Sequence, residues 1–108
     1  MSDFETLVPI GAAHFPVKDP GPTRRYAFVL VPGFTLLAFS SAVEPLRIAN
    51  QLSQQPLYKW QVLSETGGPV LSSSGIPVGA SGGLDALARD ARLFICAGNP
   101  PMAAASPA

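Results

Sequence analysis

The run YAFVLV, Tyr26–Val31, places the strongest constraint on how this chain can fold. Its six residues are all apolar, and Pro32 and Gly33 end the run. A strand with one face in water would alternate apolar and polar residues, and this run does not alternate. It therefore predicts a strand covered on both faces, as in a parallel sheet flanked by helices.

The segment after this strand has the spacing of an amphipathic helix. Its apolar stripe consists of Leu36, Phe39, Val43, Leu46 and Asn50. Thr35 is placed to act as the N-cap. Pro45 removes a backbone donor, so either the helix kinks there or a second short helix begins. Glu44 and Arg47 are expected to be solvated or paired with each other.

The remaining segments complete the pattern of an open α/β sheet. Residues 57–64 predict a second strand nearer an edge, and residues 92–98 predict a third, apolar strand. Between them, 67–78 predicts a small hairpin or arm, and 83–91 a short helical turn. The order strand, helix, strand, arm, short helix, strand is typical of the opening of such a sheet.

With 108 residues, the chain is long enough for one small domain. Residues 1–23 carry four prolines without a regular period and are expected to form a disordered leader. The ordered part is expected to span 24–98. The low-complexity stretch 99–108 is expected to be an unstructured tail.

Composition excludes several classes of function. Seven basic and seven acidic residues give no basic excess, so we expect no direct binding of nucleic acid. No stretch reaches the roughly 18 apolar residues that span a bilayer, and the start does not resemble a signal peptide. With a single cysteine as well, we expect a cytoplasmic protein without a membrane partner. The sequence lacks metal-ligand spacing and phosphate-loop patterns, so no metal or cofactor is expected.

The candidate ligand site lies at the carboxyl ends of two predicted strands. VPGF and CAGN each follow an apolar strand, and ligands of open α/β sheets bind in the crevice outside such ends. The candidate ligand-binding residues are Gly33, Phe34, Thr35, Ala97 and Gly98. The alternative is that both glycines only form turns. Likewise, Phe34, Phe39, Tyr58 and Trp60 either surround a quaternary ammonium group or simply belong to the core.

Cys96 is the only cysteine, and we expect it to be structural. A nucleophile elbow requires a sharp strand-to-helix turn, and Pro100 and Pro101 argue against a helix at that point. A nucleophile also needs a nearby base. The only histidine, His14, lies in the predicted leader. No catalytic residue is therefore assigned.

Three strings together resemble a known family. YAFVLVPGFTLLAFSSAVEPLRIANQLS, LYKWQVLSETGGPVLSSSGIPV and ARLFICAG are similar to the amino-terminal half of the PfpI-like, class I glutamine amidotransferase-like domain of GlxA-type regulators in the AraC family. The resemblance covers about Arg24 to Gly98. It implies a flavodoxin-like sheet that senses a small-molecule effector and dimerises. The overall similarity is greatest to the subgroup that regulates carnitine, choline and betaine catabolism.

The resemblance also implies that the chain is not an enzyme. In the enzymatic relatives, an acidic residue occupies the position of Ala38, and the nucleophile elbow would lie on a strand beyond Ala108. The expected fold is thus an incomplete flavodoxin-like parallel sheet with flanking helices and a small β arm. The expected function is that of a truncated sensor domain that lacks the DNA-binding part of such a regulator. We expect its tail to result from a shifted reading frame or a premature stop. Its exposed third strand predicts self-association. A fragment of a PfpI-like amidase or hydrolase and a stand-alone interaction module are the alternatives.

Overall fold

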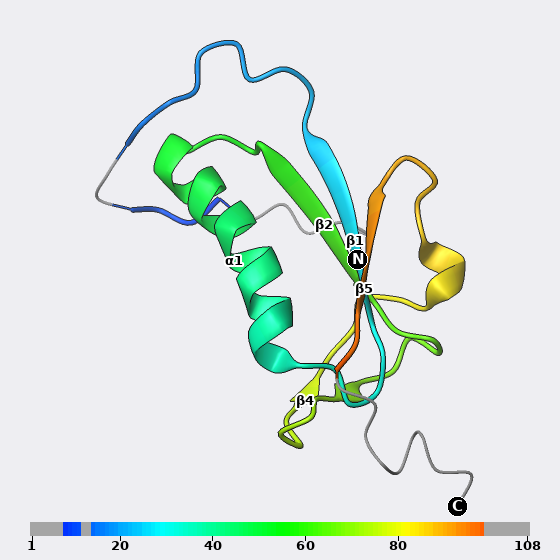
Figure 1. Cartoon of the computed structure of the whole chain (residues 1–108). Helices are drawn as coiled ribbons and strands as arrows, with labels where there is room; N and C mark the ends of the chain where they lie inside the picture. Colours follow the sequence, from blue (N-terminus) through cyan, green and yellow to red (C-terminus); the bar gives the residue numbers. More distant parts are fainter. Residues whose placement is uncertain (1–7, 12–13, 99–108) are drawn as a thin grey trace, which may run out of the picture.

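The computed structural model describes residues 8–11 and 14–98, which form an α/β fold of one long helix and a three-stranded parallel sheet (Figure 1). The predicted tail 99–108 and residues 1–7 and 12–13 lie outside the described residues. In chain order the elements are β1 (Arg24–Leu30), α1 (Leu36–Ser53), β2 (Tyr58–Leu63), β3 (Val70–Leu71), β4 (Pro77–Val78), the short 3-10 helix η1 (Leu84–Ala86) and β5 (Arg92–Cys96). This order and the predicted fold class are confirmed.

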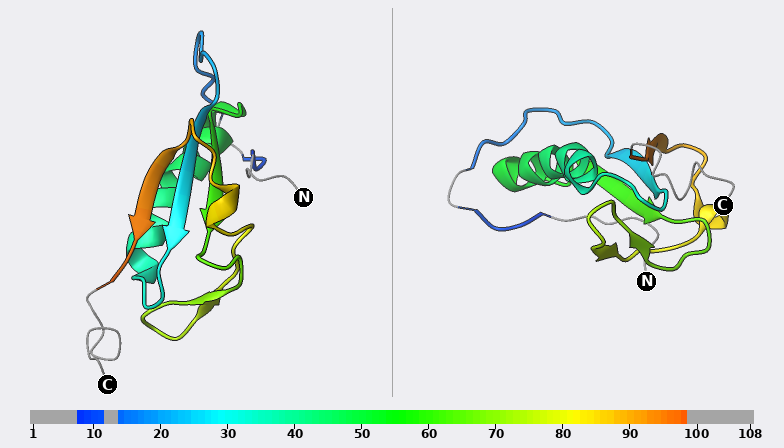
Figure 2. Two further views of the ribbon diagram at one scale, coloured as in Figure 1. Left: turned by 90° about the vertical axis from the view of Figure 1, so that its right-hand side faces the viewer. Right: turned by 60° about the horizontal axis from the view of Figure 1, so that its bottom comes forward.

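The apolar run that opened the sequence analysis forms the central strand. The sheet order is β2-β1-β5, and both pairings are parallel. Ala27, Phe28 and Leu30 of β1 are each at most 1% exposed, as expected for a strand covered on both faces. Figure 2 shows the three strands side by side, with α1 behind them and the short helix on the opposite face.

Aromatic side chains fill the layer between the sheet and α1. The ring of Phe28 packs edge-on against Phe39 of α1, with centroids 5.8 Å apart, and stacks on Phe94 of β5 at 5.6 Å. Leu36 and Phe39 also pack against a buried cluster of Leu30, Phe34 and Val70. Burying each such side chain stabilises the fold by roughly 1.5–3 kcal/mol. The predicted apolar stripe of α1 therefore holds the helix against the sheet.

Helix α1 runs without a break from Leu36 to Ser53, through Pro45. The alternative of a second short helix beginning at Pro45 is therefore wrong. Pro45 lies on the exposed side of the helix, where its ring meets water rather than the sheet. Thr35 occupies the N-cap position with an extended backbone, but its side chain makes no capping hydrogen bond.

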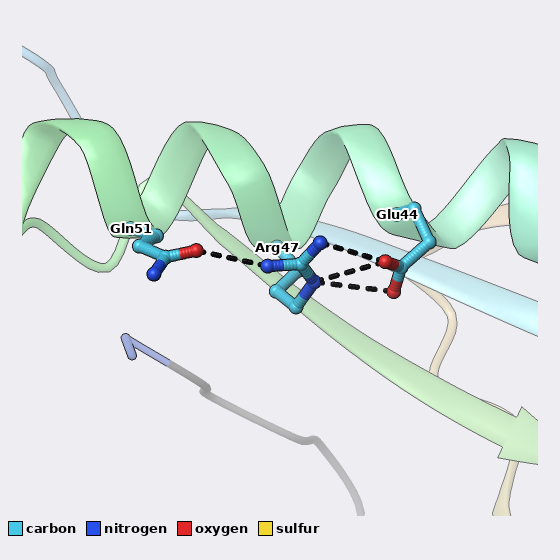
Figure 3. Close-up of polar contacts among 3 residues, drawn as sticks. All are labelled: Glu44, Arg47 and Gln51. Atoms are coloured by element: carbon cyan, nitrogen blue, oxygen red, sulfur yellow. Dashed lines mark hydrogen bonds and ion pairs between the residues drawn. The ribbon is translucent and has the colours of Figure 1, made fainter. Parts of the chain in front are cut away.

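The exposed face of α1 carries a chain of polar contacts (Figure 3). The guanidinium of Arg47 lies 2.7 Å from the Glu44 carboxylate and donates a 2.8 Å hydrogen bond to Oε1 of Gln51. The predicted pairing of Glu44 with Arg47 is confirmed. Hydrogen bonds and charge from Arg47 hold the pKa of Glu44 below its ordinary value. Gln51 in turn donates to the carbonyl oxygen of Ile10.

The described part of the predicted leader lies along the end of α1. It forms no helix or strand. The amide of Gln54 donates to the carbonyl oxygen of Pro9, and the N–H of Phe15 donates to the carbonyl of Leu52. Gln55 exchanges two hydrogen bonds with the backbone of Val17. Side-chain amides therefore hold this segment against the domain.

The two outer edges of the sheet differ. Beside β2, Gly82 bridges to Leu63 and its carbonyl accepts from Ser64, so a loop partly covers this edge. The buried amide of Gln61 also donates to the carbonyl of Ala86 and accepts from the N–H of Ala88, which fixes η1 over β2. Within the described part of the chain, β5 pairs with β1 alone.

Strand β5 is consequently the exposed side of the molecule. Leu93, Phe94 and Ile95 are 48%, 45% and 66% exposed. These three neighbours include side chains on both faces of the strand, so neither α1 nor η1 reaches far enough to cover it. This exposure agrees with the expected exposed third strand, because no described strand lies on the outer side of β5. Among the described helices, none has the length and apolar character needed to cross a membrane.

Candidate functional site

The two predicted glycine turns lie together at the carboxyl edge of the sheet. The N–H of Val31 donates to the carbonyl of Cys96 at 3.0 Å, and the N–H of Thr35 donates to the carbonyl of Ala97 at 3.3 Å. A Cβ placed on Gly98 would overlap the carbonyl oxygen of Gly33 and approach the Thr35 hydroxyl. The contact between the two turns thus requires glycine at position 98.

The turn after β1 uses its backbone donors internally. Gly33 has a φ of +83°, which glycine adopts without strain. Its N–H donates to the carbonyl of Leu71, and the N–H of Phe34 donates to Val31. With the bond donated by Thr35, the N–H groups of Gly33, Phe34 and Thr35 all donate to carbonyl oxygens of the protein itself. Of the predicted site residues, Ala97 and Gly98 are the two whose N–H groups have no acceptor within residues 8–11 and 14–98.

Phe34 differs from the other candidate residues because it is fully buried. Its ring packs edge-on against Phe39 with centroids 5.9 Å apart, and its backbone pairs with Ser72 beside the arm. Phe34 is therefore a core residue that supports the turn from behind. Trp60 is also buried, so these rings form the core rather than a cage for a quaternary ammonium group.

A hollow that the sequence analysis missed opens beside the same edge, between the ends of β1 and β2. Its volume is about 260 Å³. Its walls are mostly apolar, and Glu65 is its one charged residue. The hollow is lined by Leu30, Pro32, Ser64, Glu65, Thr66, Gly68, Pro69, Val70 and Leu71.

A tight turn shapes one wall of this hollow. The hydroxyl of Ser64 donates to the carbonyl of Gly68 at 2.7 Å and accepts from the N–H of Gly67 at 2.9 Å. Ser64 is thus engaged within the protein, whereas Glu65 and Thr66 are exposed at the rim. The only sequence signal for this feature is the string SETGGPV, whose small residues follow directly on a strand.

Cys96 has the environment of a structural thiol. It is half-buried at the end of β5 and packs against the cluster of Leu30, Phe34 and Val70. Burial raises the pKa of the Cys96 thiol, whereas a nucleophile needs it lowered. Ala38 is exposed in the first turns of α1, and the first turn carries no acidic residue. Among residues 8–11 and 14–98, this geometry supplies no partner to activate the thiol.

We expect the folded chain to react slowly with iodoacetamide at neutral pH. Because burial disfavours the thiolate, the alkylation rate should be several-fold below that of the same chain unfolded in guanidinium. The rate in the folded chain should still rise with pH where the rate in the unfolded chain has levelled off, because burial moves thiolate formation to higher pH. Mass spectrometry of timed samples measures both rates. Alkylation faster in the folded chain would contradict a structural role.

Comparisons with known proteins find relatives of the chain among regulators of transcription. It is 49% identical over 86 residues to the HTH-type transcriptional regulator CdhR of Pseudomonas aeruginosa, in a match covering 80% of this chain and 25% of that protein. It is 42% identical over 85 residues to the HTH-type transcriptional regulator GlxA of Rhizobium meliloti, covering 78% and 26% of the two proteins. The relatives of this chain are HTH-type transcriptional regulators.

Two further comparisons agree with this result. The HTH-type transcriptional regulator GbdR of Pseudomonas aeruginosa is 42% identical over 83 residues, covering 77% of this chain and 22% of that protein. The crystal structure of an AraC family transcriptional regulator from Pseudomonas putida superposes with a TM-score of 0.59 at 27% identity, covering 69% of this chain and 47% of that one. No protein-family model matches the chain. The chain spans about a quarter of the length of the curated relatives it matches.

Proposed function

We propose that this chain is the sensing part of a GlxA-type regulator in the AraC family, built on a PfpI-like domain that has no enzymatic activity. The observation that carries the proposal is the 49% identity to a transcriptional regulator over 86 residues, 80% of this chain. The environment of Cys96 supports a domain without catalysis, because partial burial raises the pKa of its thiol and no described neighbour lowers it. DNA binding would then belong to other parts of such a regulator.

The effector is proposed to bind at the carboxyl edge of the sheet. Two features support this place: the N–H groups of Ala97 and Gly98, which are donors without an acceptor in the described chain, and the hollow beside the turn at Gly33. Open α/β sheets bind their ligands at this edge. Thr35 contributes its hydroxyl, while Phe34 acts only by supporting the turn.

The effector class is proposed to be a trimethylammonium compound such as carnitine, choline or betaine. The hollow has apolar walls that suit methyl groups, and its only charged lining residue is the carboxylate of Glu65. An apolar wall with one carboxylate favours a small organic cation over an anion. Betaine and carnitine also carry a carboxylate, whose oxygens would accept hydrogen bonds from the N–H groups of Ala97 and Gly98.

Titration of the isotope-labelled chain with choline, betaine and carnitine tests this proposal by NMR. We expect saturable shifts at Thr66, Gly68 and Gly98 in the wild type. Glu65→Gln should weaken binding about tenfold, since it removes the attraction between the carboxylate and the quaternary ammonium charge. Asp85→Asn is the matched control, because Asp85 is an exposed acid that does not line the hollow.

Choline lacks a carboxylate, so tighter binding of betaine would assign a role to the backbone donors of Ala97 and Gly98. An absence of saturable shifts for all three compounds would overturn the proposed effector class. Equal loss of binding in Glu65→Gln and Asp85→Asn would place the effector elsewhere.

A further inference from the structure

The amino ends of the three parallel strands form a second hollow, on the edge of the sheet opposite the candidate effector site. Because β1, β2 and β5 run in the same direction, their first residues meet at this edge (Figure 1). The hollow is open and has a volume of about 690 Å³. Its lining residues are Pro22, Thr23, Arg24, Arg25, Tyr26, Lys59, Asp90 and Arg92.

This edge concentrates the positive charge of a chain that is neutral overall. The sequence has seven Lys and Arg residues, and four of them line this one hollow. Asp90 is the only acidic residue in the lining. Four positive side chains against one negative leave a local excess of three positive charges. A concave surface of one sign focuses its field and concentrates ions of the opposite sign.

The single carboxylate of the hollow is already engaged. Nη1 of Arg25 lies 2.8 Å from Oδ2 of Asp90. In the described part of the chain, no carboxylate forms an ion pair with Arg24, Lys59 or Arg92. Three cationic side chains therefore face this hollow without an acidic partner.

The strand register places one pair of like charges, Arg25 and Lys59, side by side and brings Arg92 close to them. Arg25 of β1 is the direct neighbour of Lys59 on β2, and Arg92 of β5 is the neighbour of Tyr26, one residue further along β1. Directly opposed like charges destabilise a sheet. These cations arise from three different segments of the chain, so the fold rather than a local run brings them together.

We propose that this hollow binds a small anion with two or more phosphate or carboxylate groups. Arginine side chains suit both groups, because the planar guanidinium donates two parallel hydrogen bonds to their oxygens. A volume of about 690 Å³ is within the range of small-molecule sites. The three remaining cations, Lys18, Arg47 and Arg89, are not part of the lining, so no extended basic stripe continues from the hollow as nucleic-acid binding would require. This site is separate from the proposed effector site.

Calorimetry on the full chain at constant ionic strength tests the proposal, with pyrophosphate and citrate as the two probes. We expect saturable binding of at least one probe, and the tighter of the two identifies phosphate or carboxylate as the preferred group. Arg24→Gln and Arg92→Gln should each weaken that binding about tenfold. Arg89→Gln removes an exposed arginine close to Arg92 but outside the lining, and it should bind as the wild type does.

Thermal unfolding gives a second readout that does not depend on calorimetry. The preferred anion should raise the Tm of the wild type, since it relieves the repulsion between the cations. Arg92→Gln should leave the Tm in plain buffer unchanged or higher, while reducing the increase caused by the anion. If Arg92 had only a structural role, Arg92→Gln would lower the Tm both in plain buffer and with the anion present.

Three results would overturn the proposal. One is the absence of saturable binding of both probes to a wild type that unfolds cooperatively. Another is an equal loss of binding in Arg89→Gln, which would indicate a general charge effect. The third is saturable binding of a DNA duplex at the same ionic strength with neither small probe bound, which would assign the hollow to nucleic acid.

Discussion

Gly98→Ala should lower the free energy of unfolding by about 2 kcal/mol, and the Tm by roughly 8–16 °C. The added Cβ would overlap the carbonyl oxygen of Gly33, which is backbone and cannot rotate away. The end of β5 and the turn after β1 must then separate. This movement would weaken the hydrogen bonds that join Val31 to Cys96 and Thr35 to Ala97. Thermal denaturation followed by circular dichroism measures the change.

Gly79→Ala is the control for this substitution. A Cβ at Gly79 meets nothing within 4 Å, and the backbone there lies outside the left-handed region. This substitution should therefore change the Tm little or raise it slightly, because alanine restricts the unfolded chain. If Gly98→Ala and Gly79→Ala gave the same Tm, the close contact between the two turns would not exist in solution.

Much of the fold could be predicted from the sequence because its signals are local. The unbroken apolar run of β1 and the helical spacing of Leu36 and Phe39 each depend on one segment. Whether the helix continues through Pro45 could not be predicted in this way. Whether a proline splits a helix depends on which side of the helix meets the sheet, and here Pro45 faces water.

The candidate site was predicted only in part, for a reason of topology. Parallel strands bring their carboxyl ends together, so the meeting of Gly33 with Gly98 followed from the strand order. The hydrogen bonds that join Gly33 to Leu71 and Ser73 to the carbonyl of Phe34 did not, because they depend on how the arm after β2 folds back. The same holds for the hollow at Glu65, since a turn within residues 64–68 creates it.

The basic hollow shows how a whole-chain property can conceal a local one. Equal numbers of acidic and basic residues argued against direct binding of nucleic acid. The register of the sheet nevertheless gathers Arg24, Lys59 and Arg92 at one edge and leaves most acidic residues elsewhere. The distribution of charge over the fold, rather than its sum, decides which ligands such an edge attracts.

Strand β5 is the part of the surface most suited to contact a second copy of the chain. Within the described residues its outer edge pairs with no strand, and the side chains of Leu93, Phe94 and Ile95 are about half exposed or more. An antiparallel pairing centred on Phe94 would place Leu93 of one copy opposite Ile95 of the other, so apolar groups would meet along the strand. No charge lies between Leu93 and Cys96 to oppose this pairing.

Ile95→Lys should weaken self-association of the chain at least tenfold. The substitution places a charge where the second copy would pack. At 66% exposure, Ile95 contributes little to the core, so the Tm of the dilute chain should change little. Sedimentation velocity over a range of concentrations measures the association. Leu37→Lys is the control, because Leu37 is 74% exposed on α1, away from the strand edge. A wild type that stays monomeric at every concentration, or equal effects of the two lysines, would exclude β5 as the contact.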